Sequence, residues 1–214
     1  MLILTLLQNP AAALAFIAGL VLGITIHEFS HAYVAYRLGD PTAKLAGRLT
    51  LDPRSHLDPI GTLALLLVGF GWGKPTPFDP FNLRNIKRDS ALISAAGAVS
   101  NLILAFVLSL PYIIAYVTGN PSLQIVEIYR VLSIIIWINV ILAVFNLIPV
   151  APLDGFKVLA GLLPRNWYDD FMQTERFGIF ILLFLMITGA IGRIILPIVS
   201  ALTGLLLPGL RLPI

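Results

Sequence analysis

One long apolar segment limits what this chain can fold into more than any other feature. From Ala11 to Tyr36 the sequence consists mainly of Ala, Leu, Phe, Ile, Val and Gly, and it contains no Lys, Arg or Asp. A helix of this length can cross the hydrocarbon core of a bilayer. We therefore expect a transmembrane helix at residues 11–36.

The rest of the chain also has the composition of a membrane protein. Of its 214 residues, 58% are hydrophobic and 12% are charged, and the mean hydropathy of +0.93 is too high for a soluble domain. No composition shift or repeat divides the chain, so residues 1–214 are predicted to form a single domain, with a core at 11–163 and C-terminal membrane helices at 177–210. The net charge of +3 is dispersed among apolar spans. This dispersion favours contact with an anionic lipid bilayer and predicts no nucleic-acid partner.

The first apolar segment contains the motif His27-Glu28-Phe29-Ser30-His31. On a helix His27 and His31 share one face, so both imidazoles can bind one metal ion, and Glu28 can reach a water on that ion. The alternative is that the histidines are packed polar residues and the pattern arose by chance. Ionisable groups at membrane depth are costly and usually mark a functional site, which favours the metal interpretation.

Charge bias predicts which side of the membrane the motif faces. The stretch 37–59 holds Arg37, Lys44, Arg48 and Arg54, and basic loops lie in the cytoplasm, so the first helix should run inward with its motif nearer the cytoplasmic side. The next apolar run, 60–73, is too short to cross and is basic on both flanks. We expect it to be re-entrant or hairpin-like, and a short transmembrane helix remains an alternative.

The later spans complete the predicted topology. Residues 90–117 should cross outward, 118–124 should form an outer turn, and 125–150 should return inward. The polar stretch 157–176 is expected to be a cytoplasmic loop, and 177–210 either one kinked span or a short helical hairpin. The predicted fold class is an all-α polytopic membrane protein, a compact bundle of about four to six transmembrane helices with a short re-entrant or β-hairpin-like element.

A catalytic zinc ion usually takes three protein ligands, so a third donor is needed beside His27 and His31. The chain has no cysteine, and the donor must be a histidine or a carboxylate. Asp154 is the candidate, because the predicted topology brings it to the same side and Gly155 lets the backbone approach closely. An N-cap role for Asp154 is the alternative. His56 is a rival ligand, although a solvated or interfacial position is the more usual one for a histidine in a basic loop.

Three further residues are candidates for supporting roles. Gly97 lies in a run of small residues that would let another helix pack closely, and Asn101 shares its helix face. Asn146 precedes two prolines that interrupt the helix, so its amide could hold a substrate backbone or a developing oxyanion. Hydrogen bonding between helices is the alternative role for both asparagines and for Asn139.

The motif at 27–31, followed by Asn146-Leu147-Ile148-Pro149 and by Leu153-Asp154-Gly155, resembles the site-2 protease family of intramembrane zinc metalloproteases. The similarity extends from about Gly19 to Leu159, and it is closest to the short prokaryotic branch that lacks a PDZ domain. Where the family often has Pro after the glycine, this chain has Ala98. No ligand or catalytic group is lost by that change.

The resemblance implies that His27, His31 and Asp154 bind one Zn²⁺ per chain, that Glu28 is the catalytic base, and that Asn146 lies beside the catalytic centre. It also implies an enzyme of the prokaryotic cell membrane that cleaves a transmembrane helix of another membrane protein, as in regulated intramembrane proteolysis. No oligomeric state is predicted. Two alternatives use the same residues: a membrane metal transporter or sensor, and an inactive scaffold that binds membrane helices.

Overall fold

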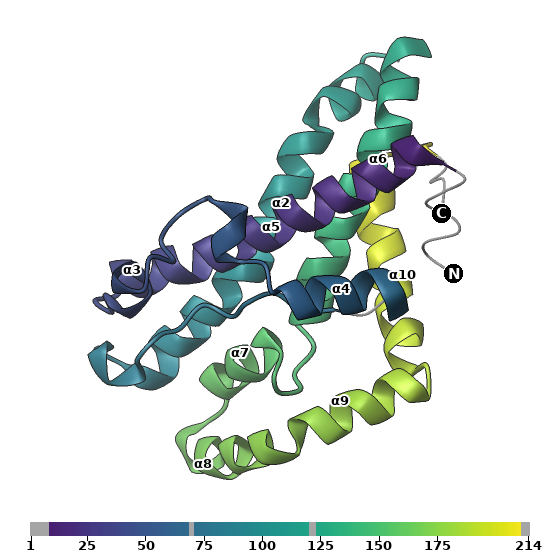
Figure 1. Ribbon diagram of the computed structural model, residues 1–214. Helices are drawn as coiled ribbons and strands as arrows, with labels where there is room; N and C mark the ends of the chain where they lie inside the picture. The colour runs from purple at the N-terminus through teal and green to yellow at the C-terminus, as the bar shows by residue number, and fades with distance from the viewer. Residues whose placement is uncertain (1–8, 69–70, 120–122, 211–214) are drawn as a thin grey trace.

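A computed structural model describes residues 9–68, 71–119 and 123–210, and helices form almost all of the ordered structure in those ranges (Figure 1). No strand occurs in the described residues, which contain one isolated bridge between Leu57 and Gly73. The helices are, in chain order, α2 (Pro10–Arg37), α3 (Thr42–Leu45), α4 (Pro59–Val68), α5 (Ile86–Val117), α6 (Leu123–Asn146), α7 (Asp154–Leu162), α8 (Arg165–Gln173), α9 (Gly178–Ile187) and α10 (Ala190–Leu206). The protein is therefore all-helical, as predicted.

Three described helices are long and apolar enough to cross a membrane: Pro10–Arg37, Ile86–Val117 and Ile128–Asn146. A fourth candidate is the pair Arg165–Ile187 and Ala190–Leu206, which is bent by 77°. The chain is thus a polytopic membrane protein, and the described residues supply three or four candidate spans, at or just below the lower end of the predicted range of about four to six. The break after α9 falls at Gly189, whose φ of 70° is left-handed.

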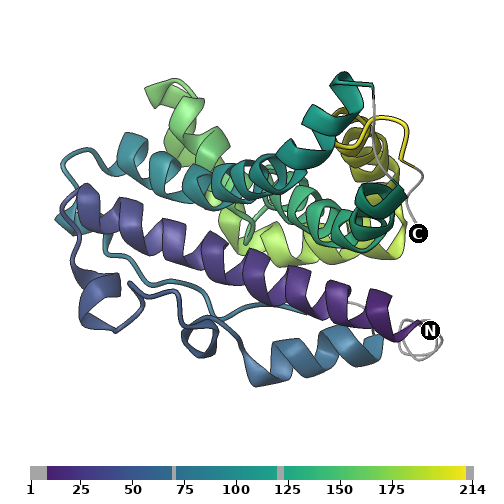
Figure 2. The ribbon, with the colours of Figure 1, turned by 90° about the horizontal axis from the view of Figure 1, so that it is seen from above.

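Helix α5 is the centre of the bundle and packs against α2, α6 and α7. On its C-terminal half a cluster of buried side chains joins it to α6 and α10, including Tyr112, Ile136 and Val199. On its N-terminal half Ile93 packs with Ala35 of α2 and with Leu83. Figure 2 shows α2 lying along α5, with α4 and its flanking segments on the other side of α2. This arrangement encloses the middle of α2 on two sides.

The short apolar run after α2 folds back toward its own start. Helix α4 has ten residues, or roughly 15 Å at 1.5 Å per residue, which is half the thickness of a bilayer core. The chain then returns, and the bridge between Leu57 and Gly73 joins the segments before and after α4. The hairpin-like part of the prediction is limited to this single bridge.

The expectation of a loop at residues 157–176 is wrong. The chain continues there through the end of α7 and through α8, followed by a 3₁₀ turn at Thr174–Phe177. The polar residues of α8 lie on an exposed face, while Phe171 stacks on Phe156 of α7 with ring centroids 4.6 Å apart. Polarity alone suggested a loop, but helical spacing gives this segment an apolar contact on one face.

Candidate metal centre

Helix α2 brings two imidazole rings to one buried face. His27 and His31 are four residues apart in an unbroken helix, and each is less than 9% exposed. Their ring centroids lie 4.6 Å apart in an edge-to-face arrangement. The predicted sharing of one helix face by the two rings is therefore confirmed.

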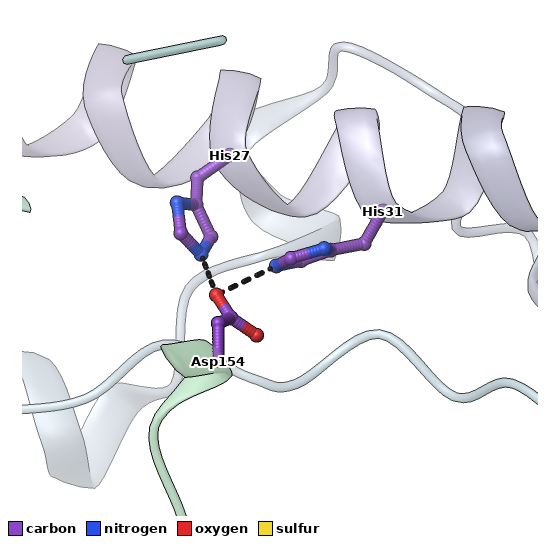
Figure 3. Close-up of side chains that lie close together, drawn as sticks. All are labelled: His27, His31 and Asp154. Atoms are coloured by element: carbon purple, nitrogen blue, oxygen red, sulfur yellow. Dashed lines mark hydrogen bonds and ion pairs between the residues drawn. The ribbon is translucent and has the colours of Figure 1, made fainter. Parts of the chain in front are cut away.

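Asp154 reaches these rings from the first turn of α7. Its Oδ2 lies 3.0 Å from Nε2 of His27 and 3.2 Å from Nε2 of His31. Figure 3 shows the three side chains pointing toward one another across the space between the helices. The three residues form a group of potential metal ligands whose ligand atoms all lie within 4.8 Å of one another, and His56 is not among them.

Close backbone packing places α7 where Asp154 can reach α2. A Cβ at Gly155 would lie 2.2 Å from the carbonyl oxygen of Leu147, so only glycine fits there. At the other end of α7, a Cβ at Gly161 would lie 2.3 Å from Cβ of Ala91 on α5. Lys87 of α5 donates a hydrogen bond to the carbonyl oxygen of Leu163. The predicted close approach at Gly155 is therefore present, and α5 fixes both α2 and α7.

Asn101 on α5 determines which nitrogen of His27 faces Asp154. Its Nδ2 donates to the carbonyl oxygen of Gly23 at 3.0 Å and to Oδ1 of Asn139 at 2.9 Å. Because both hydrogens of the amide are used, Oδ1 of Asn101 is the atom 2.7 Å from Nδ1 of His27, and Nδ1 must donate to it. Nε2 of a neutral His27 is then an acceptor.

The same logic applies to His31. Its Nδ1 lies 2.7 Å from the carbonyl oxygen of Ile93, a group that can only accept. Two imidazole lone pairs therefore converge on a carboxylate oxygen, an arrangement that suits a cation between them. Atoms bound tetrahedrally at about 2.1 Å to one ion lie roughly 3.4 Å apart. The donor set and its spacing thus fit a zinc ion.

Gly97 provides the room for both rings. A Cβ at this position would lie 2.5 Å from Cε1 of His27 and 2.6 Å from Nε2 of His31. Contacts that short cannot exist, so any side chain at 97 would displace the histidines. From the sequence, Gly97 was expected to let another helix pack closely. In the structure, the groups that pack against it are the rings of His27 and His31 on α2.

Glu28 does not join the three-residue group but is held by the segment after α4. Its Oε2 accepts a hydrogen bond from the backbone N–H of Thr76 at 2.7 Å. The hydroxyl of Thr76 also donates to the backbone oxygen of Glu28 at 3.0 Å. Sequence reasoning missed Thr76, although its position between two prolines already indicated an extended segment.

His56 lies outside the ligand group, and Asn146, the candidate for contact with substrate or oxyanion, makes a local hydrogen bond. Asn146 ends α6, and its Nδ2 donates to the carbonyl oxygen of Leu142 at 2.9 Å. His56 is fully buried, with Nε2 2.7 Å from the carbonyl oxygen of Thr50. Of the two positions expected for His56, solvated or interfacial, the solvated one is therefore wrong, because the side chain is fully buried. Asn139 bonds Asn101 across two helices, as its alternative role predicted.

Comparison with known proteins identifies relatives of the whole arrangement. A profile of peptidase family M50 matches residues 109–189, a range that includes Asn146 and Asp154. The chain is 39% identical over 184 residues to a Bacillus subtilis protein named "Putative zinc metalloprotease YwhC", covering 85% of this chain and 84% of that one. It is 30% identical over 182 residues to "Putative zinc metalloprotease Rip2" of Mycolicibacterium smegmatis, covering 83% and 68%. No solved structure matches the chain. On this likeness the chain belongs to peptidase family M50, the site-2 protease family of metalloproteases.

Proposed function

We propose that the protein is an intramembrane zinc metalloendopeptidase that hydrolyses peptide bonds within or near transmembrane helices of other membrane proteins. The observation that carries the proposal is the convergence of His27, His31 and Asp154 at a buried point beside Glu28. Two neutral imidazole acceptors and one carboxylate are a typical catalytic zinc set, which leaves one position for water or substrate. The chain would act as a single membrane domain with one zinc ion.

Each residue of the site would have a distinct part in hydrolysis. A bound zinc ion supplies Lewis acidity that activates water and polarises the scissile carbonyl. Glu28 would accept a proton from the attacking water and later deliver it to the leaving amine. Asn101 and the Ile93 carbonyl would keep the Nε2 atoms of the histidines free for the metal. Asn146 remains a candidate for contact with substrate or oxyanion through its second amide hydrogen.

The substrate would have to be locally extended, because a helical peptide hides its carbonyls in hydrogen bonds. The segment after α4 is a candidate surface for such a stretch by strand addition. Within it the N–H groups of Lys74 and Thr76 are already used, by the carbonyl of His56 and by Glu28. Pro75 and Pro77 have no N–H. The carbonyl oxygens of Lys74 and Pro75 accept hydrogen bonds from Arg48. Pairing with substrate would therefore depend on Gly73 and on the carbonyl oxygens of Thr76 and Pro77.

The site would lie toward the cytoplasmic side of a prokaryotic cell membrane. Arg37 ends α2, Lys44 and Arg54 lie in the segment after it, and the ligand pair lies in the last three turns of that helix. Positive loops are retained on the cytoplasmic side. The lipid bilayer would thus supply both the substrate and the medium that excludes bulk water from the site.

The proposal can be tested with purified full-length protein and a model transmembrane substrate. Wild type should contain about one zinc per chain and cleave the substrate. Glu28→Gln should keep its zinc and lose activity by roughly 10²- to 10⁴-fold, the usual contribution of a general base. Asp154→Ala should lose zinc and activity together. Equal cleavage by wild type and Glu28→Gln would refute the assigned base, and cleavage without zinc would refute the metal.

A further inference from the structure

A buried arginine lies behind the segment that holds Glu28. Arg48 is 5% exposed, and it forms no ion pair with any described residue. Its Nε also has no hydrogen-bond partner within the described part of the chain. Burying a guanidinium without a carboxylate in contact is costly, so the fold must gain something specific from this side chain.

The two contacts of the Arg48 head group are backbone carbonyls of adjacent residues. Nη1 donates to the carbonyl oxygen of Pro75 at 3.2 Å, and Nη2 donates to that of Lys74. A planar guanidinium binds two neighbouring acceptors in one fixed geometry, whereas the donors of an ammonium rotate and do not fix that geometry. Arg48 therefore fixes the orientation of the peptide groups immediately before Thr76.

Thr76 connects this segment to Glu28 through two hydrogen bonds. It carries the only backbone N–H between Lys74 and Phe78, because its neighbours Pro75 and Pro77 have none. That N–H is bonded to Oε2 of Glu28, and the Thr76 hydroxyl is bonded to the Glu28 backbone. The single backbone N–H between Lys74 and Phe78 is therefore already hydrogen-bonded to the Glu28 carboxylate.

The segment has little freedom to move away from α2. The N–H of Lys74 donates to the carbonyl oxygen of His56 at 2.8 Å. A Cβ at Gly73 would lie 2.9 Å from Cγ2 of Ile24, one turn before Glu28. Burial lowers the pKa of Arg48, and the negative charge of Glu28 partly offsets this by raising it.

We infer that Arg48 is a positioning residue for the catalytic base: it pins the carbonyls of Lys74 and Pro75 so that the Thr76 N–H holds the Glu28 carboxylate in one orientation. The inference rests on the proposed role of Glu28. The hydrogen bonds of Arg48 go to the backbone of Lys74 and Pro75 and not to His27, His31 or Asp154. Its effect should therefore fall on turnover and leave metal binding unchanged.

The test compares Arg48→Met and Arg48→Lys with wild type in the full-length, zinc-loaded protein. The matched control is Arg54→Met, because Arg54 lies on the same loop, has a 90% exposed side chain and pairs with Asp52. Both Arg48 variants should bind zinc as wild type does and lose about tenfold or more in kcat, with KM changed by less than about threefold. Arg54→Met should behave as wild type.

A second readout follows the hydrogen bond itself. Hydrogen exchange at Thr76 should be slow in wild type and about tenfold or more faster in Arg48→Met, because an N–H exchanges when its acceptor is lost. Full kcat in Arg48→Met, loss of its zinc, or an equal defect in Arg54→Met would each overturn the inference. If Glu28→Gln cleaves normally, the proposed function fails instead. An inactive Glu28→Gln beside a fully active Arg48→Met overturns only the role of Arg48.

Discussion

Gly97 and Asn101 act on the same histidines from one face of α5. The glycine leaves room for the two rings, and the asparagine turns the ring of His27 so that Nε2 faces Asp154. Neither residue offers a ligand atom to the group. Residues of this kind set the orientation of a metal ligand and commonly affect metal affinity by about 10- to 100-fold.

The first prediction concerns Gly97→Ala. The new methyl group would overlap with both imidazoles, so the histidines must move. Overpacking of this kind usually costs about 1–3 kcal/mol in stability, and we expect zinc affinity to fall by at least about tenfold. Affinity is measured by competition with a chromophoric chelator.

Gly192→Ala is the matched control for that measurement. Gly192 is also helical, but a Cβ there would meet no atom within 4 Å. This variant should bind zinc as wild type does and should be unchanged or slightly more stable. If Gly97→Ala also binds zinc normally, the two rings are not confined in the way the packing requires.

The second prediction concerns Asn101→Leu. An apolar side chain of similar size removes the acceptor from Nδ1 of His27 and the donor from Asn139. His27 can then adopt the other tautomer, and zinc affinity should fall by about 10- to 100-fold. Ser109→Ala, a buried change on the same helix with a local hydrogen bond to Phe106, is the control. Equal zinc affinities for the two variants would contradict the orienting role.

At the scale of elements, buried hydrogen bonds hold the loops after α2 in a defined conformation. Asp40 is fully buried and accepts hydrogen bonds from Thr42, from the Asp79 backbone at 2.8 Å and from Asn82 at 2.8 Å. These contacts tie the end of α2 to the segment that leads into α5. The loop 38–58 and the returning segment 71–85 therefore form one unit behind the site.

The third prediction is the pH dependence of that unit. Burial tends to raise the pKa of Asp40, but the hydrogen bonds from Thr42, Asn82 and the Asp79 backbone outweigh it and lower the pKa below its ordinary value. A lowered native pKa means that the carboxylate stabilises the fold above the unfolded value of about 3.9 and that this contribution is lost as pH falls through the native pKa.

Asp40→Asn should therefore cost about 1–3 kcal/mol of unfolding free energy at pH 6, where wild type has the charged acceptor. The difference should shrink on acidification below about pH 4. Unfolding in detergent at several pH values measures it, with Asp170→Asn on an exposed face of α8 as control. A difference that is constant with pH would show that the charge of Asp40 contributes nothing.

The sequence predicted those elements for which one pattern, such as apolar length or helical spacing, is sufficient. The span of α2 and the shared face of His27 and His31 follow from apolar length and helical spacing. The helical form of 157–176 did not, because there the signal is one aromatic contact between Phe156 and Phe171 from separate helices. The contacts of Thr76 and Arg48 could not be predicted either. They involve backbone N–H and carbonyl groups, which every residue type carries, so no pattern of side chains indicates them.

At the scale of the whole molecule, the chain joins three distant segments at one point. The ligand atoms come from α2 and α7, and α5 lies against both helices. The loops near the site carry Lys44, Arg48 and Lys74, whereas the turn at Thr118 and Gly119 carries no basic residue. This asymmetry is what predicts a cytoplasmic orientation of the site.

The fourth prediction tests that orientation. The chain has no cysteine, so one introduced thiol can be labelled without interference. Arg54→Cys lies on the loop after α2 and Thr118→Cys at the C-terminal end of α5, and both native side chains are exposed. In intact cells a membrane-impermeant maleimide should label Thr118→Cys, because the charge bias of the loops predicts that this end faces outward. Arg54→Cys should be labelled only after permeabilisation or in inverted vesicles. The reverse pattern would place the site on the outer side, against the charge bias of the loops.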